Sequence, residues 1–272
     1  MPRISFEDGI LTHECEDWID FNDFITERLD RSPIMWRGQR DAAWLLEPSL
    51  ARLVRRLPHK KDAGLRHLAN FRYATRGRRG PSPRQIPEGN DDEWLALGQH
   101  HRLATPLLDW TQSPYVAAFF AYSEEQAPPK KLRAVYGLVE TSVIRKSNKL
   151  YDDWLAATAQ LEARGDSGAV QQLGRAETVT FIRPLTDENQ RLISQNGLFT
   201  RSPLDIDIEQ WIRKHFPGEA KFPKLYKLLL PDAERLTALK SLNRMNINFL
   251  SLYPDIEGAS LHCNMMLEIE HY

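Results

Sequence analysis

The chain has 272 residues, and its 36 Lys and Arg side chains nearly balance its 37 Asp and Glu side chains. Hydrophobic residues make up 42% and charged residues 27%, which excludes a wholly disordered or collagen-like protein. No apolar run approaches the ~20 residues needed to cross a bilayer, and residues 1–10 lack the apolar core of a signal peptide. With Cys15 and Cys263 as the two cysteines, we expect neither a disulfide scaffold nor a zinc site built from cysteines. A cytoplasmic protein without a membrane partner is expected.

The net charge of −1 results from an uneven distribution of charge along the chain. Residues 1–30 hold nine acidic and two basic side chains, whereas residues 51–84 hold eleven basic side chains and one acidic side chain, Asp62. So basic a stretch favours contacts with the phosphates of RNA, DNA or a nucleotide, and Phe71 and Tyr73 are placed to stack on bases. A plain solvated surface and a docking site for an acidic partner protein remain open alternatives.

The predicted elements mix helices and strands without a βαβ period. In chain order they are a helix over 14–30, a short strand over 34–36, mostly helical residues over 48–76, a helix from Asp91 to about His101, a helix with Ser113 as N-cap and Pro114 as its first residue, a strand over 134–139, a helix over 149–164, strands over 178–182 and 225–230, a helix from Pro231 to about 243, and a last helix over 256–266. The Gly- and Pro-rich residues 77–90 predict a mobile basic loop.

This irregular mixture favours one α+β domain over residues 1–272, in which short strands of a mixed β-sheet pack with several helices. Its acidic N-terminal helix is expected within residues 1–32. Walker and GxGxxG motifs are absent from the sequence, so P-loop and Rossmann nucleotide binding have no support.

Two segments concentrate residues that bind or titrate. In the first, Trp36-Arg37-Gly38-Gln39, an Arg at a strand end offers a planar fork to phosphate or carboxylate, and the Gly leaves room for a ligand. The second segment, residues 98–121, embeds polar groups among apolar residues; they are Gln99, His100, His101, Thr105, Asp109, Thr111 and Ser113. Arg37 is a candidate partner of Asp109. A structural polar network that braces two helices explains the same pattern.

At these residues the sequence resembles the FRG-domain family, which is named for an aromatic-Arg-Gly motif near its start. The resembling blocks are Trp36–Gln39, Gln99–Ala121, Arg191 with Gln195–Thr200, and Leu252–Gly258. The sequence departs from the family at Arg102, Ala104 and Pro106, where Gly, Pro and Arg are usual. Because the family is mostly bacterial and phage-associated, the resemblance implies a toxin in a toxin–antitoxin or phage-defence setting, with an antitoxin or another protein as partner.

A weaker resemblance, to ADP-ribosyltransferases, lies in Arg37-Gly38, the turn at 111–113 and the Ala/Phe helix at 116–120. It implies an ADP-ribosyltransferase-like fold, NAD as the substrate, and a macromolecular acceptor, either nucleic acid or protein. Those enzymes usually carry a late catalytic Glu in a Gln/Glu-x-Glu pair. Glu257 and Glu268 are the candidates, and Glu257 lies outside such a pair.

This resemblance implies a role for each residue of the site. The implied catalytic residues are Asp109, His100 and Glu257, and the implied NAD-binding residues are Arg37, Gly38, Gln39, Thr105, Thr111, Ser113 and Gln195. Arg37 would grip the pyrophosphate, and Asp109 or a distal Glu would stabilise the oxocarbenium-like cation. No metal is expected, because the sequence has no pair of His at i and i+4. The alternatives are a non-catalytic nucleic-acid or nucleotide-binding module and an effector that acts through protein contacts.

Overall fold

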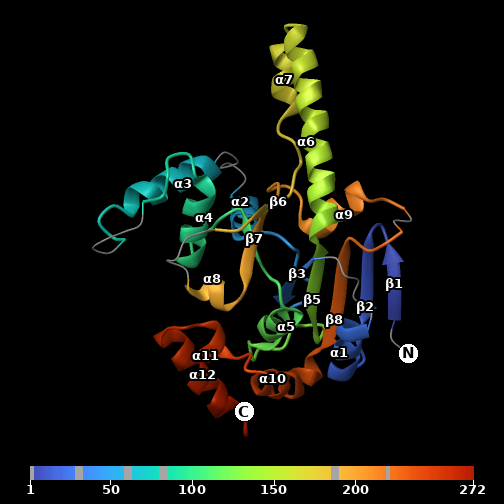
Figure 1. Cartoon of the computed structure of the whole chain (residues 1–272), viewed down its shortest axis with the longest axis vertical. Coiled ribbons are helices and arrows are strands. Elements are labelled where there is room, and N and C mark those ends of the chain that lie inside the picture. Colours follow the sequence, from blue (N-terminus) through green and yellow to red (C-terminus); the bar gives the residue numbers. More distant parts are fainter. Residues whose placement is uncertain (1–2, 28–32, 58–62, 80–84, 185–189, 219–220) are drawn as a thin grey trace.

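The computed structural model describes residues 3–27, 33–57, 63–79, 85–184, 190–218 and 221–272. Its centre is a mixed eight-stranded sheet with the order β1-β2-β8-β5-β3-β4-β7-β6 (Figure 1). The strands are β1 Arg3–Glu7, β2 Ile10–Glu14, β3 Ile34–Gln39, β4 Leu107–Thr111, β5 Leu132–Val139, β6 Thr180–Ile182, β7 Gly197–Arg201 and β8 Leu225–Pro231. β2 and β8 pair in parallel, and the other described pairs are antiparallel. The expected α+β class with a mixed sheet is confirmed.

Helices cover both faces of this sheet. They are α1 Trp18–Glu27, α2 Ser49–Arg56, α3 Ala63–Ala74, α4 Asp91–His100, α5 Pro114–Tyr122, α6 Glu140–Ala163, α7 Ser167–Leu173, α8 Gln190–Ser194, α9 Ile208–His215, α10 Arg235–Arg244, α11 Phe249–Leu252 and α12 Ile256–Glu268, with a 3₁₀ turn at Asp232–Glu234. α6 and α7 contact each other and extend away from the sheet (Figure 1). No helix in the described part of the chain is long and apolar enough to cross a membrane.

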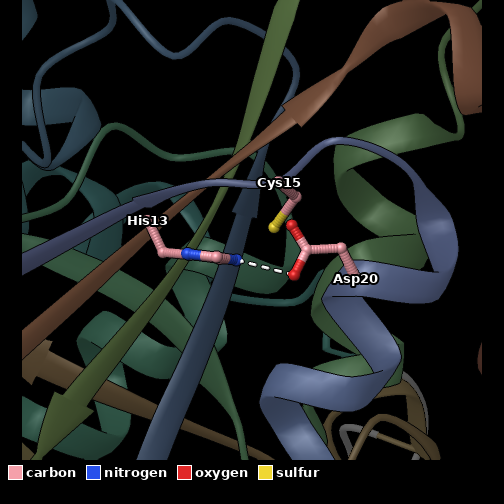
Figure 2. Close-up of side chains that lie close together, drawn as sticks. All are labelled: His13, Cys15 and Asp20. Atoms are coloured by element: carbon pink, nitrogen blue, oxygen red, sulfur yellow. Dashed lines mark hydrogen bonds and ion pairs between the residues drawn. The ribbon is translucent and has the colours of Figure 1, made fainter. Parts of the chain in front are cut away.

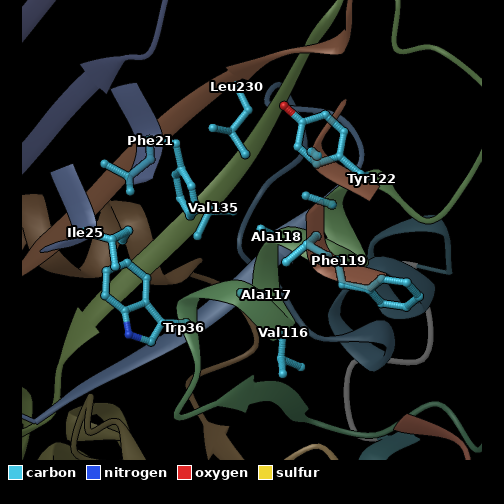
Figure 3. Packing of buried hydrophobic residues seen from close by; sticks show 14 of the residues in the cluster. Phe21, Ile25, Trp36, Val116, Ala117, Ala118, Phe119, Tyr122, Val135 and Leu230 are labelled. Carbon is cyan, nitrogen blue, oxygen red and sulfur yellow. The ribbon is translucent and has the colours of Figure 1, made fainter. Parts of the chain in front are cut away.

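The central strand β5 is buried on both faces, which its continuous apolar sequence requires. Val135 and Val139 join the core under α1, α5 and α10, while Ala134 and Tyr136 join the core under α6 and α9. Figure 3 shows α5 lying across the first of these two cores. The alternation along β5 therefore separates two layers of helices.

The close packing of α5 depends on a residue of the first motif. A Cβ at Gly38 would overlap the backbone oxygen of Ala117 and lie 2.6 Å from the backbone nitrogen of Ala121. Only a glycine lets this turn of α5 rest directly on β3. The predicted start of α5 is confirmed, because the Ser113 side chain accepts a hydrogen bond from the Val116 amide and Pro114 follows it.

The helix expected over 14–30 is present as α1, which spans Trp18–Glu27 among the described residues. Residues 3–14 form a β-hairpin, which was not predicted. Asp8 and Gly9 turn the chain with φ of 47° and 75°. β2 then pairs along β8, which buries Ile10. This long-range pairing overrides the local sequence pattern.

Other boundaries also differ from the sequence prediction. The strands β4 and β7 were not predicted. The polar Asp109 interrupts the apolar run of β4, and the apolar run of β7 is short. Helix α6 begins at Glu140 instead of about 149. The N-cap of α4 is Asn90, whose side chain accepts from the Glu93 amide, and not Asp91. Of the loop expected over 77–90, residues 80–84 lie outside the described residues.

Candidate functional site

The two sequence motifs meet where strands β3 and β4 separate. These strands share one registered pair, Trp36 with Thr111, within the residues described for them. Beyond that pair β3 runs on with β5, while β4 keeps a five-residue register with β7. The sheet therefore opens between β3 and β4, next to Arg37 and Asp109.

Arg37 bridges this opening. Its Nη1 donates to the backbone oxygen of Asp109 at 2.9 Å and lies 3.6 Å from Asp109 Oδ2. Its side chain is 21% exposed, against 56% for Asp109. Burial lowers the pKa of Arg37, and the adjacent Asp109 charge opposes that shift. The predicted pairing of the two motifs is confirmed, and it leaves a cation at the bottom of an open site.

A chain of hydrogen bonds fixes Asp109 from behind. Gln99 Nε2 donates to Asp109 Oδ2 at 3.1 Å, and Gln99 Oε1 accepts from the hydroxyl of Thr105. Thr105 is fully buried, and its backbone nitrogen donates to Ser49 Oγ at 3.1 Å. Gln99 and Thr105 therefore orient the Asp109 carboxylate, and they also join α4 to α2 through Ser49.

A pocket of about 320 Å³ opens over the pair. It is lined by Trp36, Arg37, Gly38, Asp109, Trp110, Thr111, Phe120, Gln195 and Tyr253. Four of these are aromatic residues, and a cation, a carboxylate, a hydroxyl and an amide are the polar groups among them. This combination suits a ligand with a flat ring and an anionic group.

The third block of the resemblance joins the pocket through the turn before β7. Thr111 Oγ1 donates to the backbone oxygen of Gln195 at 2.7 Å. Gln195 Nε2 in turn donates to the backbone oxygen of Leu252 at 3.2 Å. The turn residue with positive φ is Asn196, at 47°.

The fourth block supplies one wall. Arg191 Nη2 bonds Glu257 Oε2 at 2.6 Å, and its Nε donates to Asp255 Oδ2 at 2.8 Å. The Arg191 guanidinium lies 4.8 Å from the ring centre of Tyr253. Burial raises the pKa of Tyr253, whereas the hydrogen bond from Arg191 lowers the pKa of Glu257. Glu257 is thus held as an ionised partner of Arg191 and Arg102.

The remaining predicted site residues lie elsewhere or serve the scaffold. Gln39 is buried, with Nε2 donating to the Leu45 backbone oxygen at 3.3 Å. Ser113 caps α5, and Glu268 pairs with Arg235. His100, at the end of α4, is not among the lining residues of the pocket.

Sequence reasoning did not assign a site role to four lining residues. They are Trp36, Trp110, Phe120 and Tyr253. Each stands inside or beside a resembling block, but an aromatic residue in a strand or helix is more often core than ligand contact. Only the opening between β3 and β4 distinguishes these four from the other core aromatics.

The basic stretch forms a second surface along α2 and α3. Arg55 pairs with Glu47, and Arg72 with Asp91. Arg76 stacks 3.6 Å over the ring of Tyr73, which is 70% exposed. A shallow hollow here is lined by Phe71, Tyr73, Ala74, Thr75, Arg76 and Arg78. The basic residues Lys60, Lys61 and Arg84 lie outside the described residues.

The comparison with protein families covers the first two of the four blocks that resemble the FRG-domain family. The model of the FRG domain matches residues 32–130, which run from the start of β3 to just before β5. The third and fourth blocks lie outside this match, although the structure joins them to the same pocket. No curated protein and no solved structure matches the chain.

Proposed function

Because the chain carries an FRG domain over residues 32–130, we propose that this domain's pocket binds NAD and transfers ADP-ribose to a macromolecular acceptor. The observation that supports the proposal is the position of Arg37, whose guanidinium lies in the split between β3 and β4 next to Asp109. Its Nε is buried and has no hydrogen-bond partner among the described residues. A polar atom left in this state beside a pocket is suited to a ligand oxygen.

The pocket's size and lining fit one half of a dinucleotide. Its volume of about 320 Å³ is at the lower end of the range for ligand sites, ~300–1,000 Å³. Nicotinamide and its ribose would stack on the aromatic wall made by Phe120 and Tyr253, and the pyrophosphate would face Arg37. The other half of NAD would lie along the open side.

The proposed reaction breaks the bond between C1′ of the ribose and the nicotinamide nitrogen. Nicotinamide leaves with the bonding electrons, and an acceptor oxygen or nitrogen forms the new bond to C1′. The cation that develops on the ribose needs a nearby negative charge. Asp109 fits this role because its side chain is exposed, lines the pocket and is oriented by Gln99. It also accepts the proton that the acceptor loses.

The proposed setting rests on the family resemblance alone. An ADP-ribosylating FRG protein would act as a toxin in a toxin–antitoxin or phage-defence system, with an antitoxin as protein partner. The basic residues of α2 and α3 would present a nucleic-acid acceptor, since Arg76 and Tyr73 offer a cation and a ring together.

Labelled NAD tests the proposal directly. The protein is incubated with NAD and separately with RNA, DNA and lysate protein, and both nicotinamide release and label transfer are measured. Arg37→Gln and Asp109→Asn should lose turnover, by on the order of 100-fold or more for a preorganised charged group. The matched controls are Arg164→Gln and Asp152→Asn, at exposed positions of and beside α6. Absence of turnover with every acceptor contradicts the proposal.

A second candidate function is non-catalytic binding of nucleic acid. The exposed Tyr73 with Arg76 stacked on it favours this candidate independently of the pocket. Salt-dependent binding of RNA or DNA that is weakened by Tyr73→Ala and unchanged by Asp109→Asn, without NAD turnover, would identify this function instead.

A further inference from the structure

Three potential metal ligands meet where β2 leads into α1, outside the pocket. His13 lies in β2, Cys15 directly follows that strand, and Asp20 lies in the first turn of α1. Figure 2 shows the His13 ring directed at the Asp20 carboxylate, with the Cys15 sulfur beside it. One ligand atom from each residue lies within 4.8 Å of the other two. An imidazole, a sulfur and a carboxylate are the three ligand types that zinc prefers.

The backbone fixes this arrangement in advance. The Cys15 amide donates to the Leu229 oxygen of β8 at 2.9 Å, which continues the parallel pairing of β2 with β8. On the other side, the Glu16 amide donates to Asp20 Oδ2 at 2.9 Å. Asp20 Oδ1 lies 3.0 Å from His13 Nε2. The pairing of β2 with β8 holds His13 and Cys15, and the Glu16 amide holds Asp20. Few side-chain rotations would therefore be lost on metal binding, which keeps the entropy cost of forming a site low.

Burial distinguishes this cluster from an ordinary surface group. His13 is 1% exposed and Cys15 is 4% exposed. The Cys15 thiol lies next to an imidazole and a carboxylate. A cation held between His13 and Cys15 would therefore be shielded from solvent on their side.

We propose that His13, Cys15 and Asp20 bind one Zn²⁺ ion through Nε2, Sγ and a carboxylate oxygen, with water at the fourth position. The water is placed on the side of Asp20, whose side chain is 24% exposed. Binding releases the thiol proton of Cys15 to solvent, and the imidazole is neutral with its remaining proton on Nδ1. The ion joins β2 to α1 and stabilises the edge of the sheet. The site does not depend on the proposed reaction, because it shares no residue with the pocket.

The sequence did not indicate this site. Common metal-site patterns are i, i+4 histidines and cysteine pairs, whereas these three ligands are spaced by two and five residues along a strand and the following helix. Only the parallel pairing of β2 with β8 and the turn into α1 bring the three together.

Cobalt binding provides the test, because a thiolate bound to Co²⁺ gives a near-ultraviolet charge-transfer band. This band is lost when zinc displaces the cobalt ion. The metal-free protein is titrated with CoCl₂ and then with ZnCl₂, and bound zinc is counted by mass spectrometry under native conditions. We expect one ion per chain, and a rise in Tm with zinc. Cys15→Ser should abolish the charge-transfer band. Cys263→Ser is the matched control, because Cys263 is the exposed cysteine of the described chain.

A second variant, which keeps the shape of the cluster, distinguishes the loss of a metal ligand from the loss of folding. Asp20→Asn retains a side chain of the same size, and it should weaken zinc affinity at least ~10-fold, as changes around a metal ligand do. Its circular dichroism spectrum should match that of the wild type. Absence of the band in the folded wild type overturns the proposal. A band that survives in Cys15→Ser and disappears in Cys263→Ser, or zinc affinity unchanged in Asp20→Asn, also overturns it.

Discussion

Arg37 donates a 2.9 Å hydrogen bond from Nη1 to the backbone oxygen of Asp109, across the opening between β3 and β4. A side chain thus connects two strands at the point where their backbone ladder ends. The Nε of the same guanidinium is buried and has no partner among the described residues, and Arg37 lines the pocket. Arg37 therefore makes a structural contact and lies at the proposed ligand site, and substitutions should separate these two roles.

Replacing Arg37 by Lys should reduce ligand affinity far more than stability. A lysine keeps the charge but loses the planar fork, so a bidentate contact with phosphate is lost. We expect NAD affinity to fall on the order of 10- to 100-fold, which corresponds to about 1.5–3 kcal/mol for a charged hydrogen bond. Calorimetric titration with NAD measures the affinity, and urea unfolding measures the stability. Equal affinity in Arg37→Lys and wild type would show that the fork does not contact the ligand.

Gly38→Ala should destabilise the protein by moving α5. The new Cβ would overlap the Ala117 backbone oxygen, and backbone atoms cannot move aside as a flexible side chain can. Overpacking of this kind costs about 1–3 kcal/mol or more. The matched control is Gly168→Ala in α7, where the nearest atom, Asp166 Oδ1, is 3.7 Å away. There the helix should gain about 0.5–1 kcal/mol. Urea unfolding of both variants checks the pair, and a neutral Gly38→Ala would contradict this packing argument.

Local patterns in the sequence predicted the elements that local chemistry determines. The N-cap Ser113 with Pro114, the strand over 134–139 and the last helix over 256–266 are confirmed by α5, β5 and α12. The contact between Arg37 and Asp109 was also predicted, because a polar residue embedded in an apolar frame needs a partner.

What the sequence could not show depends on pairing between distant segments. The hairpin of β1 and β2 is stabilised by β8, more than 200 residues away, and no local pattern encodes that pairing. The opening next to Thr111 follows from β4 pairing with β7 while β3 continues along β5. The place of Tyr253 in the pocket lining was missed for the same reason, since the residues at the end of α11 reach the pocket only in the folded chain.

The ion pairs around Arg191 should weaken on acidification. The hydrogen bond from Arg191 holds the pKa of Glu257 below its ordinary value of 4.5, and the Gly258 amide and then Arg191 hold that of Asp255 below 3.8. A lowered carboxyl pKa adds stability that is fully present above the ordinary value and is lost as pH falls through the lowered one.

Comparison with Arg191→Gln isolates this contribution. The stability difference between wild type and Arg191→Gln should be constant near neutral pH and shrink as pH falls below 4.5. Urea unfolding at a series of pH values measures that difference, and hydrogen exchange of the Gly258 amide reports on the start of α12. A difference that stays the same down to pH 3, or grows, would contradict this assignment of the ion pairs.

The hydrogen bond between Trp110 and Thr200 should couple the pocket wall to β7. Trp110 Nε1 donates to Thr200 Oγ1 at 2.8 Å, and both side chains are buried. Thr200→Val keeps the volume but leaves the indole N–H without an acceptor, which should cost about 1–3 kcal/mol. Trp110→Phe in the same background removes the orphaned donor, so the double variant should be more stable than the sum of the two single changes predicts. A double-mutant cycle by urea unfolding measures this coupling, which we expect at about 0.5–3 kcal/mol. Strict additivity would mean that the bond contributes nothing to holding Trp110 in the pocket wall.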